Sequence, residues 1–390
     1  MTEHMPPHLT PREDAVTHHF QSVFGTEPEG VWAAPGRINL IGEHTDYNDG
    51  FVLPLATPQH TTVAVRPRPD GLLRLHSRQA DGPTVELRVA DLEPGTVTGW
   101  AKYPAAVVWA LREDGHPVGG ADVHVDSDVP AGAGLSSSAA LECALATAYN
   151  DLNGLGLSRT ELALVAQRAE NEFVGVPCGV MDQMASMCCT PDAALFLDTR
   201  DLGSRSVPLG LDGLQLLVID TRVKHDLADG AYAKLRAGCE RAAQLLRLPA
   251  LRDLPLSGLV EALHRLPADL RPLVRHVVTE NARVEQAVAL LNAGDPAALG
   301  PILTAGHASL RDDYRVSCPE TDLAAATAEE AGALGARMTG GGFGGSVIAL
   351  VPETAVDTVG EAVIAAFHRA GHRAPRTFTA TASAGARRLG

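Results

Sequence analysis

The stretch VPAGAGLSSSAA, residues 129–140, decides the fold class of this chain. Its glycines, Gly132 and Gly134, permit a tight loop and a close approach of the backbone to a ligand. Small hydroxyl residues follow where an Ala-rich helix is expected to begin. The start of a helix offers unpaired amides and a positive dipole end, which together bind anions. The stretch therefore predicts a cradle for nucleotide phosphates.

This stretch differs from the common phosphate-binding loops. It contains no Gly-Lys-Ser/Thr, so it is not a Walker A loop, and it fails the dinucleotide fingerprint at the third glycine. A helix-capping loop, in which the small residues serve packing only, explains this stretch equally well when it is taken alone.

A dense polar cluster lies nearer the N-terminus, in APGRINLIGEHTDYNDG, residues 34–50. Strand-like residues flank it on both sides, and polar density between apolar strands indicates a ligand-lining loop on a rigid scaffold. Its acids accept hydrogen bonds from hydroxyl groups, which suits a polyol such as a sugar. A solvated loop is the alternative that composition alone favours. A metal site at Glu43, His44 and Asp46 is disfavoured because no second His follows at helical spacing.

Two later segments carry a candidate base and a backbone constraint. Asp182 stands in GVPCGVMDQM, residues 175–184, where burial would raise its pKa unless a cation such as Arg37 lies close. An Asp beside an Arg is a candidate general base, and an acid at a helix N-terminus is the alternative. The run TGGGFGGS, residues 339–346, is destabilising unless the backbone passes close to another segment. It predicts a tight interdomain turn or a second wall of the nucleotide site.

Length and charge limit the classes of protein and partner. A chain of 390 residues favours two domains or one large one. The formal charge of −15 argues against nucleic-acid and anionic-membrane partners, which need a basic surface. The chain starts without a secretory signal pattern and has no apolar run of ~20 residues that could span a bilayer. We expect a cytoplasmic protein with free thiols.

Strands and helices mix along the chain without regular alternation, so we predict an α+β fold in two domains. The expected division is a disordered lead at 1–14, an N-terminal domain at 15–205 and a C-terminal domain at 206–390. Ser158 and Glu161 fit a capping box at a helix start, and Gly154 fits the stop of the preceding helix. The sequence predicts strands at 30–34, 38–41, 61–66, 71–77, 84–89, 121–125, 195–197, 214–220, 346–351 and 377–382. It predicts helices at 102–114, 138–153, 159–174, 231–248, 270–292, 321–334 and 354–369.

Taken together and in this order, these segments resemble the three signature motifs of the GHMP small-molecule kinases. This superfamily covers galactokinases and the homoserine, mevalonate and phosphomevalonate kinases. Its middle motif is similar to residues 130–139 and its last to residues 339–346. Residues 36–48 resemble the galactokinase signature. The other branches of the superfamily lack its Gly-Glu-His-x-Asp-Tyr portion, so this resemblance is specific to the galactokinases. The resemblance implies a ribosomal S5-like N-terminal domain, a ferredoxin-like C-terminal domain and an active site in the cleft between them.

The same resemblance implies ATP-dependent phosphorylation of α-D-galactose at the C1 hydroxyl, with Mg²⁺, giving galactose 1-phosphate and ADP. This chemistry requires mainly positioning and charge neutralisation. Asp182 is the implied base or orienting group, and Arg37 the implied transition-state stabiliser. The implied sugar contacts are Glu43, His44, Thr45, Asp46, Gly179 and Tyr232. The implied nucleotide contacts are Ser77, Gly132, Ala133, Gly134, Leu135, Ser136, Ser137 and Ser138, and the implied magnesium ligands are Ser138 and Glu170.

Three alternatives stay open at this stage. A kinase of the same mechanism could act on N-acetylgalactosamine or arabinose, since acceptor choice depends on pocket shape. A catalytically silent galactose sensor on the same fold is disfavoured because the Ser-rich loop and Asp182 are intact. An unrelated sugar-binding module would not need a phosphate loop. Ala231 stands where relatives often carry an acid before the Tyr, which weakens the assignment of Tyr232. We expect galactose and MgATP as ligands and a monomer without an obligate protein partner.

Overall fold

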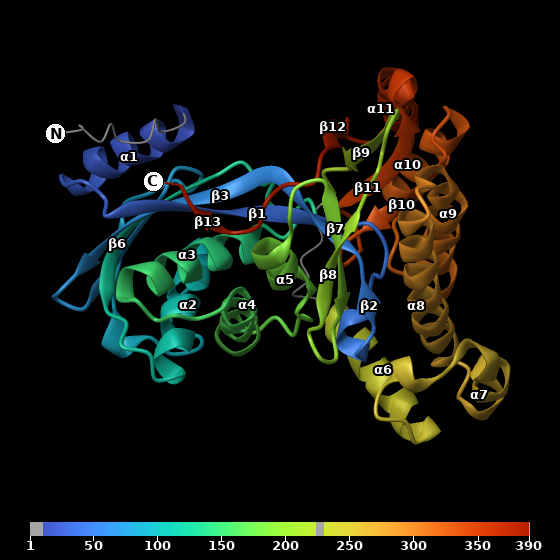
Figure 1. Cartoon of the computed structure of the whole chain (residues 1–390), viewed down its shortest axis with the longest axis horizontal. Coiled ribbons are helices and arrows are strands. Elements are labelled where there is room, and N and C mark those ends of the chain that lie inside the picture. Colours follow the sequence, from blue (N-terminus) through green and yellow to red (C-terminus); the bar gives the residue numbers. More distant parts are fainter. Residues whose placement is uncertain (1–10, 224–229, 390) are drawn as a thin grey trace.

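A six-stranded sheet organises the N-terminal half of the chain, in the order β13-β1-β3-β6-β4-β5. The computed structural model describes residues 11–223 and 230–389. Figure 1 shows α2, α3 and α4 on one side of this sheet and α1 on the other. The strands are β1 (Gly30–Asn39), β3 (Pro54–Arg68), β4 (Leu72–Ser77), β5 (Val85–Arg88), β6 (Gly120–Ser127) and β13 (Arg387–Arg388). The helices are α1 (Pro11–Phe24), α2 (Lys102–Glu113), α3 (Ser137–Asn153), α4 (Arg159–Arg168) and α5 (Met181–Cys188), and a π-helical turn follows α4 at Ala169–Val174.

Strand β1 carries the start of the polar cluster into the core. The sequence predicts two strands here, at 30–34 and 38–41, but the structure has one strand that is buried at every residue. Its pairing with β3 shifts register between Pro35 and Arg37. Proline cannot donate a ladder hydrogen bond, so a bulge at this point lets one strand continue. The bulge places Arg37 at the base of the candidate site.

A four-stranded antiparallel sheet organises the C-terminal half, in the order β10-β11-β9-β12. In the chain, helices connect β9 to β10, a hairpin connects β10 to β11, and α11 connects β11 to β12. This βαββαβ succession with its strand order is ferredoxin-like, which confirms the prediction. The strands are β9 (Leu214–Asp220), β10 (Gly335–Thr339), β11 (Ser346–Pro352) and β12 (Arg376–Ala380). The helices are α6 (Ala231–Leu246), α7 (Leu259–Arg265), α8 (Arg271–Asn292), α9 (Leu299–Ser309), α10 (Pro319–Glu330) and α11 (Val356–Ala370).

An apolar core joins the two halves. It contains Ile38 from the first sheet, Leu135 from the Ser-rich loop, Val284 from α8 and Ile348 from the second sheet. A small third sheet, β2 (Phe51–Val52), β7 (Ala193–Asp198) and β8 (Ser204–Pro208), lies between them (Figure 1). Close packing of this interface fixes how the Ser-rich loop faces the glycine-rich run.

Several sequence predictions need correction or stay open. Residues 1–10 of the predicted lead lie outside the described residues, and residues 11–14 form the first turn of α1. The boundary predicted at 205/206 falls inside β8, and β13 returns from the C-terminal end to pair with β1. The sequence analysis missed α1, α5, α7, α9, β8, β10 and β13. The capping box at Ser158 and the left-handed Gly154 are confirmed.

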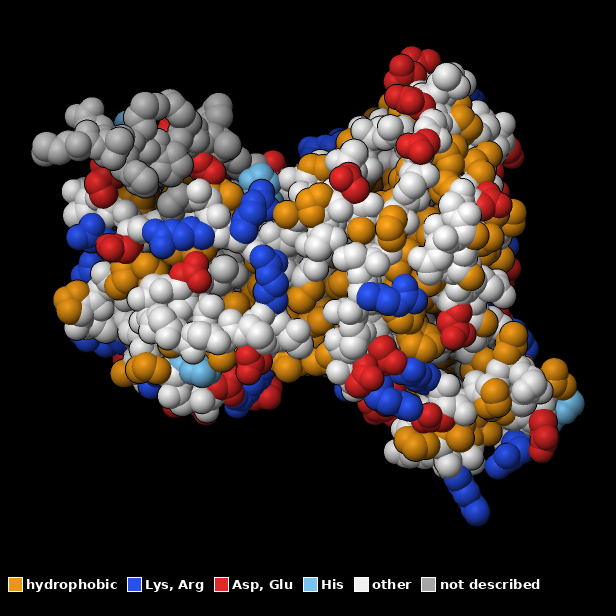
Figure 2. All heavy atoms as spheres, in the orientation of Figure 1, with side chains coloured by type: hydrophobic (Ala, Val, Ile, Leu, Met, Phe, Trp, Pro, Cys, Tyr) orange, Lys and Arg blue, Asp and Glu red, His pale blue; other side chains and the backbone are white. Residues whose placement is uncertain are grey.

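Acidic and basic side chains are interspersed on the face that Figure 2 shows, and notches separate its left and right parts. Within residues 11–223 and 230–389, no helix is long and apolar enough to cross a bilayer.

Candidate active site

Arg37 and Asp182 meet at the centre of the site, although 145 residues separate them in the sequence. Arg37 Nε donates to Asp182 Oδ1 at 2.8 Å, and Arg37 Nη2 lies 2.8 Å from the same oxygen. The Ser136 hydroxyl donates to the other carboxylate oxygen, Oδ2. The Arg37 side chain is 5% exposed and the Asp182 side chain 26% exposed. The carboxylate is therefore held on one side and open on the other.

The Ser-rich loop ends at the N-terminus of α3. Gly132 and Gly134 have φ of 75° and 73°, and Ser136 at the N-cap has φ of 56°. The Ser136 side chain makes no capping hydrogen bond, because its hydroxyl bonds Asp182 instead. Helix α3 therefore begins without a side-chain cap on its first amides, which suits an anionic ligand there.

The glycine-rich run packs backbone to backbone on the Ser-rich loop. A Cβ on Gly340 would lie 2.8 Å from the Gly134 carbonyl oxygen, and one on Gly345 would lie 3.2 Å from that of Ala133. The Ser346 hydroxyl donates to the Ala133 carbonyl at 2.7 Å. The close backbone approach predicted for residues 339–346 is confirmed, and the run forms a wall behind the loop.

Asp46 and Gly179 lie against each other beside Asp182. A Cβ on Gly179 would come within 1.9 Å of Asp46 Oδ2, so this position admits only glycine without rearrangement. Burial raises the pKa of Asp46 to about 6, and the neighbouring charge of Asp182 adds to the effect. The Tyr47 amide donates to Asp46 Oδ1 at 3.0 Å and opposes it. The second Asp46 oxygen faces Gly179.

Aromatic rings surround His44, which lies two residues before Asp46 in the chain. The His44 ring centroid lies 5.6 Å from Tyr232 on α6 and 4.7 Å from Tyr314. Its Nδ1 lies 2.8 Å from the Tyr47 hydroxyl. Burial and, secondly, the neighbouring His276 lower the pKa of His44 to about 3, so the ring is neutral at pH 7. The structure brings Tyr232 to the polar cluster at residues 34–50, which we call the sugar loop.

Glu43 and Thr45 are both buried and bond to other groups of the protein. Glu43 is 1% exposed and binds Arg337 on β10. The Thr45 hydroxyl lies 2.8 Å from the Gly42 carbonyl oxygen and 2.6 Å from that of Phe51, which fixes the loop. Their predicted direct contacts with a sugar stay predictions.

The predicted magnesium ligands are adjacent. The Ser138 hydroxyl donates to Glu170 Oε1 at 2.9 Å, and Gln183 Nε2 donates to Oε2 at 2.8 Å. Burial raises the pKa of Glu170 to about 7, and the charge of Asp182 adds to this. Glu142, which the sequence analysis missed, is fully buried beside Glu170.

Among the described residues, no group of three or more His, Cys, Asp or Glu could hold a metal ion on its own. A hydroxyl and one carboxylate still fit Mg²⁺, which is usually completed by waters and substrate phosphates.

Basic side chains line a cavity of about 220 Å³ beside the Ser-rich loop. Its lining combines Pro130, Ala131 and Gly132 with Asp220, Arg222, Arg373 and Arg376. The predicted nucleotide contact Ser77 lies at the end of β4, where its hydroxyl oxygen accepts from the Gln79 amide at 3.2 Å. No bond joins Ser77 directly to residues 129–138 in the described part of the chain. The arginines were missed because each stands alone in the sequence.

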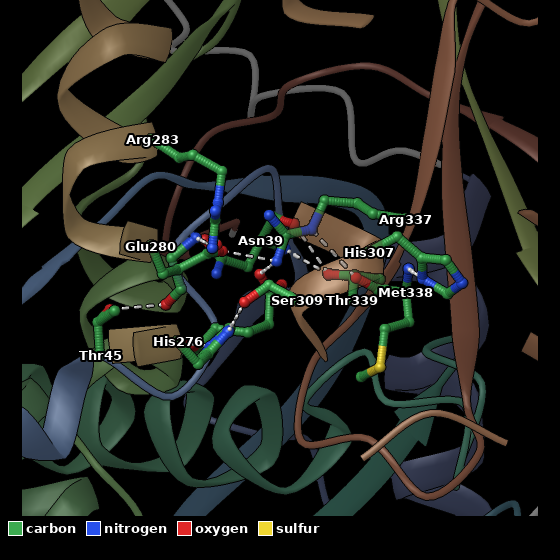
Figure 3. A network of polar contacts seen from close by, with 12 residues as sticks. Asn39, Thr45, His276, Glu280, Arg283, His307, Ser309, Arg337, Met338 and Thr339 are labelled. Atoms are coloured by element: carbon green, nitrogen blue, oxygen red, sulfur yellow. Dashed lines mark hydrogen bonds and ion pairs between the residues drawn. The ribbon is translucent and has the colours of Figure 1, made fainter. Parts of the chain in front are cut away.

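A buried network behind the sugar loop was also missed. It joins Arg337 to Glu280 and reaches Asn39 through Thr339 (Figure 3). Only Met338 separates Arg337 from the glycine-rich run at residues 339–346. A lone arginine in an apolar strand sequence was the available signal, since a buried arginine requires carboxylate partners.

The chain matches three family models and several known proteins. The models are the galactokinase galactose-binding signature at residues 18–67, the GHMP kinases N terminal domain at 102–190 and the GHMP kinases C terminal at 287–369. A galactokinase of Streptomyces coelicolor is 61% identical over 378 residues, covering 96% of this chain and 98% of that protein. A galactokinase of Roseiflexus sp. is 45% identical, covering 95% of each chain. The solved structure of Lactococcus lactis galactokinase complexed with galactose superposes with a TM-score of 0.92 at 32% identity, covering 96% of this chain and 99% of that one.

Proposed function

The chain belongs to the galactokinase family of GHMP kinases, and we propose that it transfers the terminal phosphoryl group of ATP to the C1 hydroxyl of α-D-galactose beside Arg37 and Asp182. The bond between the C1 oxygen and the γ-phosphorus forms, and the bond from that phosphorus to the β–γ bridging oxygen breaks. ADP leaves with the electron pair of that bond. The observation that carries this proposal is the Arg37–Asp182–Ser136 group at the start of α3, with its carboxylate open on one side.

Asp182 receives or orients the proton of the C1 hydroxyl. Its side chain is 26% exposed, so the carboxylate can accept a further hydrogen bond from a bound sugar while Ser136 and Arg37 hold it in place. The Arg37 guanidinium also bonds the Gly134 carbonyl oxygen, so one cation is fixed between the base and the Ser-rich loop. It is therefore placed to neutralise charge that develops on the transferred group.

The Ser-rich loop would hold the nucleotide phosphates. The first amides of α3 and the helix dipole favour negative charge, and Gly132 and Gly134 let the backbone approach it closely. Ser138 and Glu170 would hold Mg²⁺, and this cation neutralises phosphate charge when bound. Carboxylates crowd this position: Glu170 is buried near both Glu142 and Asp182, which is costly until a cation is present.

Galactose would bind against the surface formed by residues 43–46, Gly179 and Tyr232. The Asp46 carboxylate is the best acceptor there, because one of its oxygens makes no bond to the Tyr47 amide. Tyr232 and the neutral His44 add apolar ring surface beside polar tips, which suits a sugar ring. The monomeric state and the cytoplasmic location that we expect from the sequence stay predictions.

The test is product formation from ATP and Mg²⁺ with a panel of sugars, with the phosphorylated position assigned by phosphorus NMR. Galactose converted to the α-1-phosphate supports the proposal. Activity only on N-acetylgalactosamine or arabinose would keep the kinase and change the acceptor. Binding of galactose and ATP without transfer would contradict the proposal and favour a sensor.

A further inference from the structure

Arg337 is a fully buried arginine that binds two carboxylates. Its side chain is 0% exposed, and Nη2 lies 2.8 Å from Glu280 Oε1 and in contact with Glu43 Oε2. Nε donates to the Met338 carbonyl at 3.3 Å. A Cβ on Gly306 would come within 2.6 Å of Nη1, so the absence of a side chain there makes room for the guanidinium. The site is built for arginine.

The charges of this group balance within four side chains, which we call the Arg337 cluster: Glu43, Glu280, Arg283 and Arg337. Arg283 Nε donates to Glu280 Oε2 at 2.7 Å (Figure 3). Burial raises the pKa of Glu43 to about 7 although Arg337 opposes it. For Glu280 the effect of burial is outweighed by Arg337 and Arg283, which hold its pKa below the ordinary range. The Arg337 guanidinium therefore favours the ionised form of both acids: it outweighs burial at Glu280 and only opposes burial at Glu43.

The cluster holds the backbone of the predicted sugar loop from the C-terminal half of the chain. Glu280 Oε1 accepts the Gly42 amide at 3.0 Å, and His276 Nε2 lies 3.0 Å from the Glu43 carbonyl oxygen. At the start of the loop, the Asn39 amide donates to Thr339 Oγ1 at 2.9 Å, and Thr339 Oγ1 lies 3.0 Å from the Asn39 carbonyl oxygen. The loop path that carries His44 and Asp46 is thus set by side chains of α8 and β10.

The cluster also reaches the catalytic pair through the glycine-rich run. The Gly340 amide donates to Glu43 Oε1 at 3.4 Å. Gly340 in turn packs on Gly134, whose carbonyl oxygen accepts from Arg37 Nη1. One continuous set of contacts therefore runs from Arg337 to Arg37.

We propose that Arg337 is a positioning residue of the sugar site, which fixes Glu43 and, through Glu280, the Gly42 amide, and so sets where His44 and Asp46 meet galactose. This inference rests on the proposed function. Arg337 is too deeply buried to touch substrate itself, so it acts through the loop alone. Small displacements of a positioned group carry large kinetic costs. Galactose binding should depend on Arg337 much more than ATP binding does.

The test is the variant Arg337→Lys, which keeps the charge but loses the planar fork that serves two carboxylates. We expect the KM for galactose to rise roughly tenfold or more while the KM for ATP stays within about twofold. Galactose alone should also raise the Tm of this variant less than it raises that of the unaltered protein. Arg74→Lys is the matched control, because Arg74 makes a two-bond contact with Asp122 at 2.6 and 2.7 Å on β4, in another part of the fold. It should leave the ratio of the two KM values unchanged.

A second variant protects the test against misfolding. Glu280→Gln retains an oxygen for the Gly42 amide but removes one of the two charges that hold Arg337. It should raise the KM for galactose in the same direction. Equal losses for galactose and ATP in Arg337→Lys would overturn the inference and leave only a role in stability. An unchanged galactose KM in Glu280→Gln would overturn it if Arg337→Lys does not fold. Failure of the proposed function is separate, since the unaltered protein would then form no galactose phosphate.

Discussion

Each of two arginine–carboxylate groups includes a residue of the sugar loop, Arg37 in one and Glu43 in the other, and the groups differ in how far they are exposed to solvent. Arg37 and Asp182 form an ion pair whose carboxylate side chain is 26% exposed. In the Arg337 cluster the side chains of Arg337 and Glu280 are 0% exposed and that of Glu43 is 1% exposed. An ion pair that is open on one side can exchange a proton or accept a hydroxyl. A closed pair can only hold its neighbours in place.

The two groups should also respond differently to substitution. Removing one partner of a buried ion pair typically costs ~3–5 kcal/mol, because the other charge is left unpaired. We expect such losses from the Arg337 cluster. The open pair should lose its carboxylate at a smaller cost in folding free energy, because the Asp182 side chain is 26% exposed and its charge is partly screened by solvent. Substitutions in the open pair should mainly lower activity, and substitutions in the Arg337 cluster should mainly lower the free energy of unfolding.

The largest effect should come from Asp182→Asn. The amide keeps the size of the side chain and can still bond Ser136, but it cannot accept the hydroxyl proton. We expect kcat to fall by roughly a thousandfold or more, with ATP affinity close to that of the unaltered protein. Single-turnover kinetics and nucleotide titration measure the two quantities. Near-normal turnover would show that Asp182 is not the base or orienting group.

Glu170→Gln tests the carboxylate next to Ser138. The change keeps a hydrogen-bonding partner for the Ser138 hydroxyl but removes the charge that would hold Mg²⁺. We expect kcat/KM for ATP to fall by roughly a hundredfold and the Mg²⁺ concentration for half-maximal rate to rise. Mg²⁺ titration of initial rates measures both. Chelation with EDTA should abolish transfer by the unaltered protein, and an unchanged Mg²⁺ dependence in the variant would remove Glu170 from the metal site.

The sequence predicted the open group far better than the closed one. Arg37, Asp182, Ser136 and Ser138 stand in polar or glycine-rich motifs, where their residue types already indicate chemistry. Arg337 and Glu280 stand in a strand and a helix of ordinary composition, and their pairing depends on tertiary contacts between α8 and β10. The same limit explains why Glu43 was predicted as a sugar contact only. Its residue type is visible in the sequence, but its buried partner is not.

The prediction of secondary structure shows the same difference between clear local patterns and residues whose role depends on tertiary contacts. Strand β9 and the helices with clear caps or apolar periodicity were predicted close to their observed bounds. Strand β10 was missed because its five buried residues include Arg337, which hides an apolar strand pattern. Helix α5 was missed because it is short and carries Asp182 in its first turn. In both cases a charged residue to which we assign a proposed role interrupts the local pattern.

The protonation of Asp46 should change catalytic activity and folding stability in opposite directions as the pH changes. Asp46 has a pKa of about 6 in the folded chain, against an ordinary value of 3.8. The ionised acceptor is present only above that pH, so kcat/KM for galactose should fall by a fewfold as pH decreases through about 6. The raised pKa has the opposite sign for folding. The stabilising contribution of protonated Asp46 is full below 3.8 and is lost as pH rises through about 6.

Asp46→Asn checks both halves of this prediction. Its pH profile for galactose should lack the loss near pH 6, while its plateau should lie below that of the unaltered protein. Thermal unfolding of the ligand-free variant should change less between pH 4 and pH 7. A pH profile that keeps its acid limb in Asp46→Asn would assign the limb to another group.

The smallest effect concerns a third set of arginines, which is exposed to solvent. Arg373 and Arg376 are exposed at the cavity beside the Ser-rich loop, and neither forms an ion pair with residues 11–223 or 230–389. In a chain of net charge −15, such local cations can attract an anionic nucleotide. Arg376→Gln should raise the KM for ATP roughly two- to threefold at low ionic strength, and less at high salt, because exposed charges are screened. The KM for galactose should not change.

Arg265→Gln is the matched control, since Arg265 is an exposed arginine at the end of α7. Equal effects of the two variants would reduce the role of Arg376 to net charge alone, whereas an effect confined to Arg376→Gln would place the open arginines on the path of the phosphates.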